Sequence, residues 1–391
     1  MADMPAFGVY IHWPYCRRIC PYCDFNVYKA RGDDQALADA ILADLHHWRQ
    51  RLGPRPLTSL HFGGGTPSLL PPTTLAKMID QVCALFPPLD NLEIGLEANP
   101  TDHQSLAEIR QAGIERLSLG LQALNDPDLK RLGRDHGVRQ GLAALEDALV
   151  LFPRVSVDLI TAREGQTPTQ WHAELQDILR YDLDHLSVYG LTIEPGTAFA
   201  RQQDRGDLIP PDDETASTLY DITVDTLRGA GFTHYEVSNF ARHPAAQSRH
   251  NRLYWQSDDW LGLGPGAHGR LTLDGQRLAT ETHLQPKPYV EAVSTTGTGS
   301  KPPDPLSDTD QALEALIMGL RLDEGVEAAR LHALAIDPKT LRQLAEEGLV
   351  DGDLFTLGRG RGLGDSRLGG RLRLTGRGRR LLDHVLLRLT A

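Results

Sequence analysis

The sequence Tyr10-Ile-His-Trp-Pro-Tyr-Cys16-Arg-Arg-Ile-Cys20-Pro-Tyr-Cys23-Asp-Phe25 contains three cysteines spaced C-x3-C-x2-C. Structural zinc sites need four ligands, usually as two separated pairs, and this chain has no second pair. A [4Fe–4S] cluster can instead bind three thiolates and leave its fourth iron open for another ligand. The spacing therefore predicts such a cluster on Cys16, Cys20 and Cys23. The alternatives are a three-cysteine zinc site with a distant fourth ligand, or cysteines buried as small apolar residues.

The composition is that of an ordinary globular chain, with 391 residues, 40% hydrophobic and 24% charged. No apolar run approaches the ~18 residues that a membrane-spanning helix needs. The N-terminus has neither a basic stretch nor a long apolar segment, so we expect no secretory signal. Because iron-binding thiolates must stay reduced, we expect a cytoplasmic protein. The net charge of −12 argues against nucleic acid as a partner.

The remaining cysteine, Cys83, belongs to a helical pattern with an apolar face, and we expect it to pack in the core. The charge is unevenly distributed. From Thr356 to the end there are nine arginines and two aspartates, a local balance of +7. A solvated basic surface is the simple interpretation of this tail, and an edge that binds an anionic ligand is the alternative.

Short apolar or β-branched runs alternate with helical patterns through the first 235 residues. The predicted strands are Phe7–His12, Thr58–Phe62, Leu92–Ala98, Arg116–Leu121, Arg154–Ile160 and His185–Leu191. The predicted helices are Asp33–Leu52, Thr73–Phe86, Gln104–Ala112, Val138–Leu151, Thr169–Arg180 and Asp213–Ala230. Six βα units predict an α/β fold with a parallel sheet and crossover helices. Since six units are too few for a closed eight-fold barrel, we expect a partial (β/α)6 barrel.

Polar features stand where these predicted strands end. The cysteines follow the first strand, and the other four features are Gly63-Gly64-Gly65-Thr66-Pro67, Glu97-Ala-Asn99-Pro100, Gly120-Leu-Gln122 and Asp158. In parallel βα barrels the chemistry lies at the carboxyl ends of the strands. Each polar residue alone is compatible with an ordinary surface position. Together, the register of these features with the strands predicts one site.

The residue types in this site suit a zwitterionic nucleoside ligand. Glycines let a backbone approach a ligand and present its amides. An arginine such as Arg134 can bind a carboxylate through two parallel hydrogen bonds. The carboxylates of Glu97 and Asp158 and the amide of Gln122 can hold an ammonium group and ribose hydroxyls.

The rest of the chain divides by composition. We expect a core at 1–235, an extension at 236–293 that contains His250-Asn-Arg-Leu-Tyr-Trp255, and a linker at 294–308 rich in Thr, Gly, Ser and Pro. The last part, 309–391, has helical patterns and two short predicted strands, Leu354–Leu357 and Arg371–Thr375. Helices followed by a hairpin predict a small winged-helix-like α+β module.

These motifs resemble the oxygen-independent coproporphyrinogen III dehydrogenase group of radical S-adenosylmethionine (SAM) proteins, and within it the HemW-like haem chaperones. The resemblance is strong over roughly residues 7–290 and weak beyond. It implies a partial radical-SAM barrel, with SAM bound to the open iron of a [4Fe–4S] cluster on Cys16, Cys20 and Cys23. By position it implies SAM contacts at Tyr10, Tyr22, Gly64, Gly65, Thr66, Glu97, Gln122, Arg134 and Asp158.

Two departures separate the branches of this group. The dehydrogenases carry a further cysteine two residues after the third cluster ligand, where this chain has Phe25, and they have an extension before the first strand that is nearly absent here. Both departures, and the motif from His250 to Trp255, match the chaperone branch. A third cuts the other way, because the family usually reads Tyr-Gly-Leu-Pro-Gly-Gln-Thr after Asp158-Leu-Ile, and this chain has Thr161-Ala-Arg-Glu-Gly165-Gln-Thr.

The first hypothesis is therefore a haem chaperone without coproporphyrinogen dehydrogenase activity, which binds haem, the cluster and SAM. Its partners would be haem-dependent acceptors, including membrane-associated respiratory enzymes, which would give it a peripheral position at the inner face of the membrane. The alternative is a radical enzyme that decarboxylates coproporphyrinogen III. A structural metal protein without SAM is the third hypothesis. The sequence leaves the oligomeric state open.

The resemblance also directs attention to His250 as a haem ligand. A neutral imidazole binds haem iron well, and Tyr254 and Trp255 could cover the porphyrin face. A structural histidine bonded within the protein, beside aromatic side chains that simply pack, is an equal alternative. His268, in the glycine-rich turn Gly262–Gly269, is the second candidate for the ligand.

Overall fold

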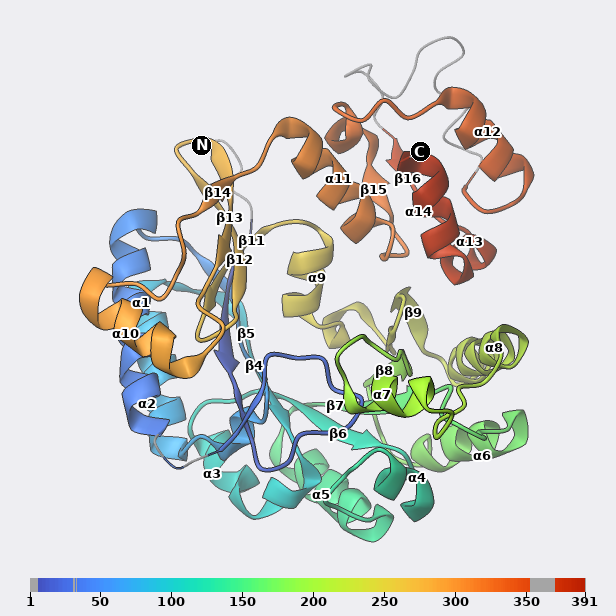
Figure 1. Cartoon of the computed structure of the whole chain (residues 1–391), viewed down its shortest axis with the longest axis horizontal. Coiled ribbons are helices and arrows are strands. Elements are labelled where there is room, and N and C mark those ends of the chain that lie inside the picture. Colours follow the sequence, from blue (N-terminus) through green and yellow to red (C-terminus); the bar gives the residue numbers. More distant parts are fainter. Residues whose placement is uncertain (1–5, 31, 33, 352–369, 391) are drawn as a thin grey trace.

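Six parallel strands, each followed by at least one helix, form the first half of the chain (Figure 1). The computed structural model describes residues 6–30, 32, 34–351 and 370–390. The strands are β1 (Phe7–Trp13), β4 (Leu57–Gly64), β5 (Pro88–Ala98), β6 (Arg116–Gln122), β7 (Arg154–Thr161) and β8 (His185–Gly190). They lie side by side in chain order, so the predicted partial barrel is confirmed.

Helices cover the outer, convex face of this curved sheet (Figure 1). They are α1 (Asp34–Leu52), α2 (Pro72–Leu85), α3 (Leu106–Gln111), α4 (Asp126–Arg131), α5 (Val138–Leu151), α6 (Pro168–Ile178), α7 (Ala198–Asp204) and α8 (Asp213–Gly229), with 3-10 turns η1 (Pro67–Leu69) and η2 (Pro100–Ser105). Short helices begin at good N-cap residues, as where Thr167 caps α6 and accepts from the backbone of Gln170. Cys83, predicted to pack in the core, is half-buried and packs at the margin of the main core.

The strands alternate apolar and polar side chains. In β6 and β7 the buried core takes Leu117, Leu119, Val155 and Val157, and the residues between them are mostly Ser, Arg, Gly and Asp. Since successive side chains of a strand point to opposite faces, the apolar set packs under the helices and the polar set faces the barrel interior. The interior is therefore a polar space, unlike the apolar faces of most parallel sheets.

The segment after β8 extends the sheet at both edges, which the sequence patterns did not predict. The added elements are β9 (Thr233–Glu236), β10 (Asn239–Ala241), η3 (Pro244–Ala246), α9 (Arg249–Trp255), β11 (Asp259–Leu263), β12 (His268–Leu273), β13 (Gln276–Glu281), α10 (Pro286–Thr296) and β14 (Asp304–Pro305). β10 pairs with β8, and β11 pairs in parallel with β1 at the far edge. The chain crosses between these edges through α9, which lies between them in Figure 1. In the described residues the sheet has twelve strands.

A buried carboxylate fastens α9 to the barrel. Glu93, in β5, accepts from the backbone N–H groups of Arg249 and His250, at 3.1 Å each, and forms an ion pair of 2.7 Å with Arg154 of β7. Burial alone would raise the pKa of Glu93, but the charges of Arg116 and Arg154 and the two N–H groups hold this pKa below its ordinary value. Arg154 is the first residue of β7, and Glu93 lies before the last five residues of β5. The helix α9 that binds Glu93 therefore closes the amino-terminal end of the barrel.

The segment 294–308, predicted as a linker, is attached to the first part of the molecule. Thr298 and the backbone of Gly299 donate to the buried carboxylate of Asp44 in α1, at 2.7 and 3.1 Å. Asp304 then pairs with Ala279 across β13 and β14. The segment 294–308 is therefore packed against α1 and β13 and is not a free linker. The division of the chain into domains stays a prediction.

The C-terminal part has its own core, in which Leu316, Leu344, Leu372 and Val385 are buried together. Its elements are α11 (Asp308–Gly319), β15 (Val326–Glu327), η4 (Ala328–Leu331), α12 (Pro338–Glu346), β16 (Arg371–Leu372), α13 (Gly376–Arg380) and α14 (Leu382–Thr390). The predicted strand 354–357 and most of the arginine-rich loop lie outside the described residues. The predicted strand 371–375 is observed as β16, which pairs with β15. None of the described helices is both long and apolar enough to cross a membrane.

Candidate functional site

A cavity of about 350 Å³ opens at the carboxyl ends of the parallel strands. It is lined by eleven of the thirteen residues that the sequence and its resemblance single out: Cys16, Cys20, Cys23, Tyr22, Gly64, Gly65, Thr66, Glu97, Gln122, Arg134 and Asp158. These residues come from five different strand ends and the helix α4 region, so the predicted register with the strands is what brings them together. Tyr10 and His250 do not line the cavity.

The cysteine loop is held by backbone hydrogen bonds at both ends. Cys16 lies in β2 (Tyr15–Cys16), which pairs with β3 (Tyr28–Lys29), and the Cys23 N–H donates to the Cys20 carbonyl at 3.1 Å. The glycine turn after β4 packs against the start of this loop. A Cβ on Gly65 would lie 2.7 Å from the Tyr15 carbonyl oxygen, so only glycine permits this approach.

Burial makes the thiols of Cys16 and Cys23 reluctant to ionise by themselves. It raises the pKa of Cys16, and it raises the pKa of Cys23 to about 11. A metal ligand must be a thiolate, so the positive charge of bound iron would have to favour the ionised form. Within the described ranges, no three His, Cys, Asp or Glu side chains are arranged to hold a single metal ion. In a cubane cluster each cysteine binds a different iron, so the three thiols must lie farther apart than around a single zinc ion. The three thiols around this cavity suit such a cluster better than a zinc site.

Arg134 reaches the same cavity from the loop after α4. Its Nη1 lies 3.4 Å from Cys20 Sγ, and its Nη2 donates to Asn99 Oδ1 and, at 3.1 Å, to the Gly120 carbonyl. The Nε atom of this arginine is buried and has no hydrogen-bond partner in the described structure. The Arg134 side chain lines the cavity, so its positive charge lies where a ligand carboxylate could bind. A guanidinium and three thiols around one cavity fit the groups that a cluster and a zwitterionic nucleoside would need.

Two carboxylates face the cavity from β5 and β7, the strands on either side of β6. Glu97 accepts from the Gly64 N–H at 3.3 Å, and Asp158 accepts from Ser118 Oγ at 3.0 Å. Burial, and then the charge of Glu97, raise the pKa of Asp158 to about 6. An ammonium group placed between them would relieve this repulsion, because an opposite charge favours the ionised carboxylate.

Comparison with known proteins agrees with this geometry. Residues 10–178 match the Radical SAM superfamily. The chain is similar to "Radical S-adenosyl methionine domain-containing protein 1, mitochondrial" of Bos taurus, with 41% identity over 88% of this chain and 81% of the relative. It is also similar to "Heme chaperone HemW" of Mycobacterium tuberculosis, with 35% identity over 99% of this chain and 96% of the relative.

The chain belongs to the HemW-like family of radical SAM proteins. Among solved structures, coproporphyrinogen III oxidase (HemN) from Escherichia coli superposes with a TM-score of 0.80 over 99% of this chain and 91% of that one, at 23% identity. That likeness shows the shared fold, and the relatives of higher identity carry the family assignment.

In this HemW-like chain Tyr10 lies behind the cavity rather than in it. Its hydroxyl bonds His12 Nδ1 at 3.0 Å, and a Cβ on Gly63 would lie 2.9 Å from its ring. Burial raises the pKa of Tyr10 well above its ordinary value. Tyr10 therefore supports the glycine turn from beneath, and a direct contact with SAM stays a prediction.

His250 lies at the opposite end of the barrel from the cysteines. It is 1% exposed, and both ring nitrogens are engaged, Nδ1 with Ser59 Oγ at 2.8 Å and Nε2 with Tyr254 Oη at 2.6 Å. The described geometry leaves neither nitrogen free for iron. It favours the structural alternative for this motif, in which α9 plugs the amino-terminal end.

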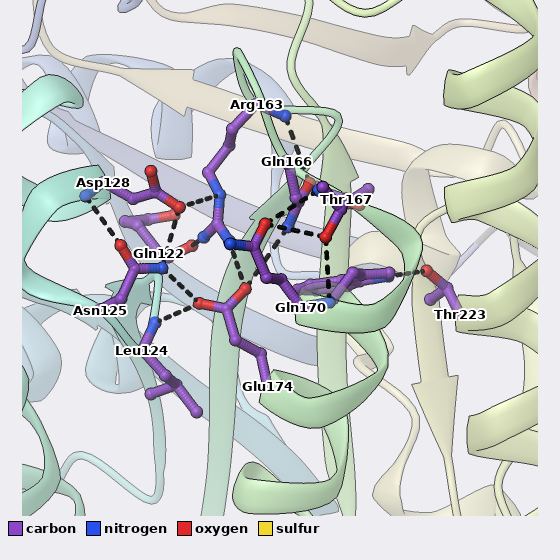
Figure 2. Close-up of polar contacts among 12 residues, drawn as sticks. Gln122, Leu124, Asn125, Asp128, Arg163, Gln166, Thr167, Gln170, Glu174 and Thr223 are labelled. Carbon is purple, nitrogen blue, oxygen red and sulfur yellow. Dashed lines mark hydrogen bonds and ion pairs between the residues drawn. The ribbon is translucent and has the colours of Figure 1, made fainter.

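The altered loop after β7 is held by a buried ion-pair network that Figure 2 shows. Arg163 donates to Glu174, lies 3.0 Å from Asp128 Oδ2, and donates to the Gln122 carbonyl at 3.4 Å. Gln122 has a φ of +70° at the irregular end of β6, and Ala162, where the family usually has glycine, has a φ of +58°. Each such residue costs roughly 1–2 kcal/mol of strain, and the network holds the loop in this geometry.

Glu164, the next residue that differs from the family pattern, also helps to hold the loop after β7. Glu164 forms an ion pair of 2.6 Å with Arg131 of α4 and accepts from the Ile209 N–H at 2.7 Å. Arg163 and Glu164 thus each tie the loop to the helix that leads to Arg134. The departure from the family pattern changes what holds the loop, and it keeps Gln122 at the cavity wall.

Several cavity residues were not given a role from the sequence, among them Asn99, Ser118 and Tyr189. Asn99 accepts from Arg134, and Ser118 donates to Asp158. The signal that could have found Ser118 and Tyr189 is the alternation within their strands, because they share the inward face with Gly120 and with Ser187. Asn99 stands in the quoted Glu97–Pro100 turn without a role assigned to it.

A first prediction concerns the half-buried carboxyl of Asp158. Because its folded pKa is raised from 3.8 to about 6, the ionised folded state loses stability as pH rises from about 4 to about 6. Asp158→Asn should therefore raise the free energy of unfolding at pH 7 by up to about 3 kcal/mol, with no gain near pH 4. Urea unfolding across pH 4–8 without SAM measures this difference.

The exposed Asp225→Asn variant is the matched control and should be neutral throughout. An Asp158→Asn variant that is no more stable than the parent at pH 7 would show that the carboxyl is not strained by burial.

A second prediction concerns Arg163. Arg163→Leu, which restores the apolar residue usual in the family, leaves Glu174 and Asp128 without their cation and should cost about 3–5 kcal/mol of unfolding free energy. The double variant Arg163→Leu/Glu174→Leu should recover part of that loss, since no unpaired buried charge remains at position 174. Urea midpoints of the two variants and the parent measure the coupling. Additive losses would mean that the two residues do not act as a pair.

Proposed function

We propose that this protein is a haem chaperone that binds a [4Fe–4S] cluster through Cys16, Cys20 and Cys23, binds SAM beside it, and delivers haem to haem-dependent proteins. The observation that supports the cofactor part is a single cavity lined by three thiols, an arginine and two carboxylates. The haem part is supported by family membership and by the printed names of the relatives.

Each wall of the cavity has a task in this proposal. Arg134 would bind the SAM carboxylate, and Glu97 and Asp158 would bind its ammonium group and ribose. The glycine turn brings backbone within reach of the nucleoside, and Gln122 is held at the wall by the Arg163 network. Bound together, the cluster and SAM would supply one-electron chemistry for the reductive cleavage of SAM. In a chaperone that cleavage would be slow or regulatory.

The delivery step defines the partners. The acceptors would be haem-dependent respiratory enzymes, including membrane-associated ones, and the protein would work in the cytoplasm or peripherally at the inner membrane face. Coproporphyrinogen III dehydrogenase activity is the competing function. Phe25 argues against it, since it lines the cavity at the position where the dehydrogenases carry a further cysteine.

One anaerobic experiment separates these functions. The reconstituted protein is given haem, then an apo-acceptor such as a haem-free respiratory oxidase, and transfer is followed by absorbance and oxidase activity. A parallel sample receives coproporphyrinogen III with SAM and a reductant. We expect haem transfer without porphyrinogen turnover. Turnover without haem binding would assign the protein to the dehydrogenases instead.

A third prediction tests the cluster. Replacing any one of Cys16, Cys20 or Cys23 by Ala leaves two thiolates, too few to hold a cubane firmly. Bound iron and the charge-transfer absorbance should be largely lost after anaerobic reconstitution. Cys83→Ala, outside the cavity, is the matched control and should keep both. Iron loss as large in Cys83→Ala as in Cys20→Ala would break the assignment.

A fourth prediction tests SAM binding. Arg134→Ala removes a charge-assisted contact worth about 1.5–3 kcal/mol, so SAM affinity should fall roughly 10- to 100-fold. Iron content should remain, because the three thiolates are unchanged. Arg134→Lys keeps the charge but not the two-pronged geometry, and should lie between the parent and Arg134→Ala. Unchanged affinity in an anaerobic titration of Arg134→Ala would remove this residue from the site.

A further inference from the structure

Large apolar side chains are exposed around the mouth of the cysteine cavity. Ten such side chains are exposed among the described residues, and three of them line this cavity: Ile19, Phe25 and Tyr189, at 47%, 62% and 42% exposure. A fourth, Leu284, is 50% exposed. Its carbonyl accepts from Asn26 Nδ2 at 2.7 Å, so it lies beside the loop that carries Phe25. Exposed apolar side chains gathered at one opening mark a binding surface.

The same loop packs against the turn that precedes His268. Asn26 Nδ2 donates to the Pro265 carbonyl at 2.9 Å, and a Cβ on Gly266 would lie 2.3 Å from that nitrogen. His268 follows at the first position of β12, and its side chain is exposed. The backbone of Asn26 also binds the barrel, because its carbonyl bonds the His12 ring at 2.9 Å. His268 therefore comes three residues after a carbonyl that binds the loop of Phe25, and it lies beside that loop at the same end of the sheet.

The imidazole of His268 differs from that of His250 in its ring nitrogens, which a metal ligand needs free of hydrogen bonds. No hydrogen bond to its ring nitrogens occurs in the described part of the chain. Its neighbour across the hairpin, Glu281, is already bonded to Lys301 at 2.7 Å. An exposed neutral imidazole can give its lone pair to haem iron, which a buried, doubly bonded one cannot do without local unfolding.

We propose that haem binds at the mouth of the cysteine cavity, against Phe25 and Leu284, with His268 as an axial ligand of its iron. This inference rests on the proposed haem-chaperone function and assigns it a place. The chemistry favours haem over a protein as the ligand. His268 offers an iron ligand, Phe25 and Leu284 offer apolar contacts for a porphyrin face, and Arg18, an exposed cation at the cavity, could bind the propionates. Haem held there is open to solvent on one side, as a carrier requires for release.

The test is an absorbance titration of the anaerobically reconstituted protein with haem, in the parent and in single variants. His268→Ala should shift the Soret band and weaken binding about tenfold or more, and Phe25→Ser should weaken it severalfold with the Soret position kept. The matched controls are His384→Ala, an exposed histidine of α14, and Val150→Ser, an exposed apolar residue of α5. Both controls should bind like the parent, and all variants should keep their iron.

Other outcomes locate the error. Parent-like haem binding in His268→Ala overturns His268 as the ligand. So does a shifted Soret band that is found only in a folded His250→Ala variant. If Phe25→Ser binds haem normally but no longer transfers it to the apo-acceptor, Phe25 belongs to a docking surface for a protein. The proposed haem site is then wrong. A parent protein that binds no haem would reject the proposed function itself.

Discussion

The polar interior of the barrel is the constraint on which the rest of this structure depends. Every second residue of the parallel strands points inward, and many of these residues are Ser, His, Arg, Asp or Glu. Buried polar groups must be paired or they destabilise the fold. The chain meets this demand differently at its two ends, and that difference separates the structural part of the molecule from the candidate site.

At the amino-terminal end the protein supplies the partners itself. Glu93 binds Arg154 and the first backbone N–H groups of α9, and its pKa is held below the ordinary value. His250 is bonded at both nitrogens by Ser59 and Tyr254. At the carboxyl end Asp158 has a raised pKa, and the guanidinium of Arg134 lines the open cavity. Groups of opposite charge around one cavity suit a zwitterionic ligand.

The altered loop after β7 illustrates how a site can be preserved when its sequence changes. Arg163 and Glu164 replace residues that the family usually has as Leu and Pro, and each forms an ion pair with a helix beside the cavity. Buried pairs of this kind contribute little net stability, because desolvation offsets much of the attraction. What they fix is geometry, here the left-handed turn at Gln122 and the position of the strand end that carries it.

The sequence by itself determined the six βα units, the cysteine loop and most of the residues around the cavity. Period-two and helical patterns are local, and strand ends fall at one edge of a parallel sheet whatever the rest of the chain does. Only the tertiary structure decided the role of the segment after residue 236. Its short strands pair with β8 and β1, which are far away in sequence, and α9 is capped by Glu93 from β5. No local pattern encodes such contacts, so His250 looked equally suited to bind haem or to be buried, and its place at the closed end of the barrel could be known only from the fold.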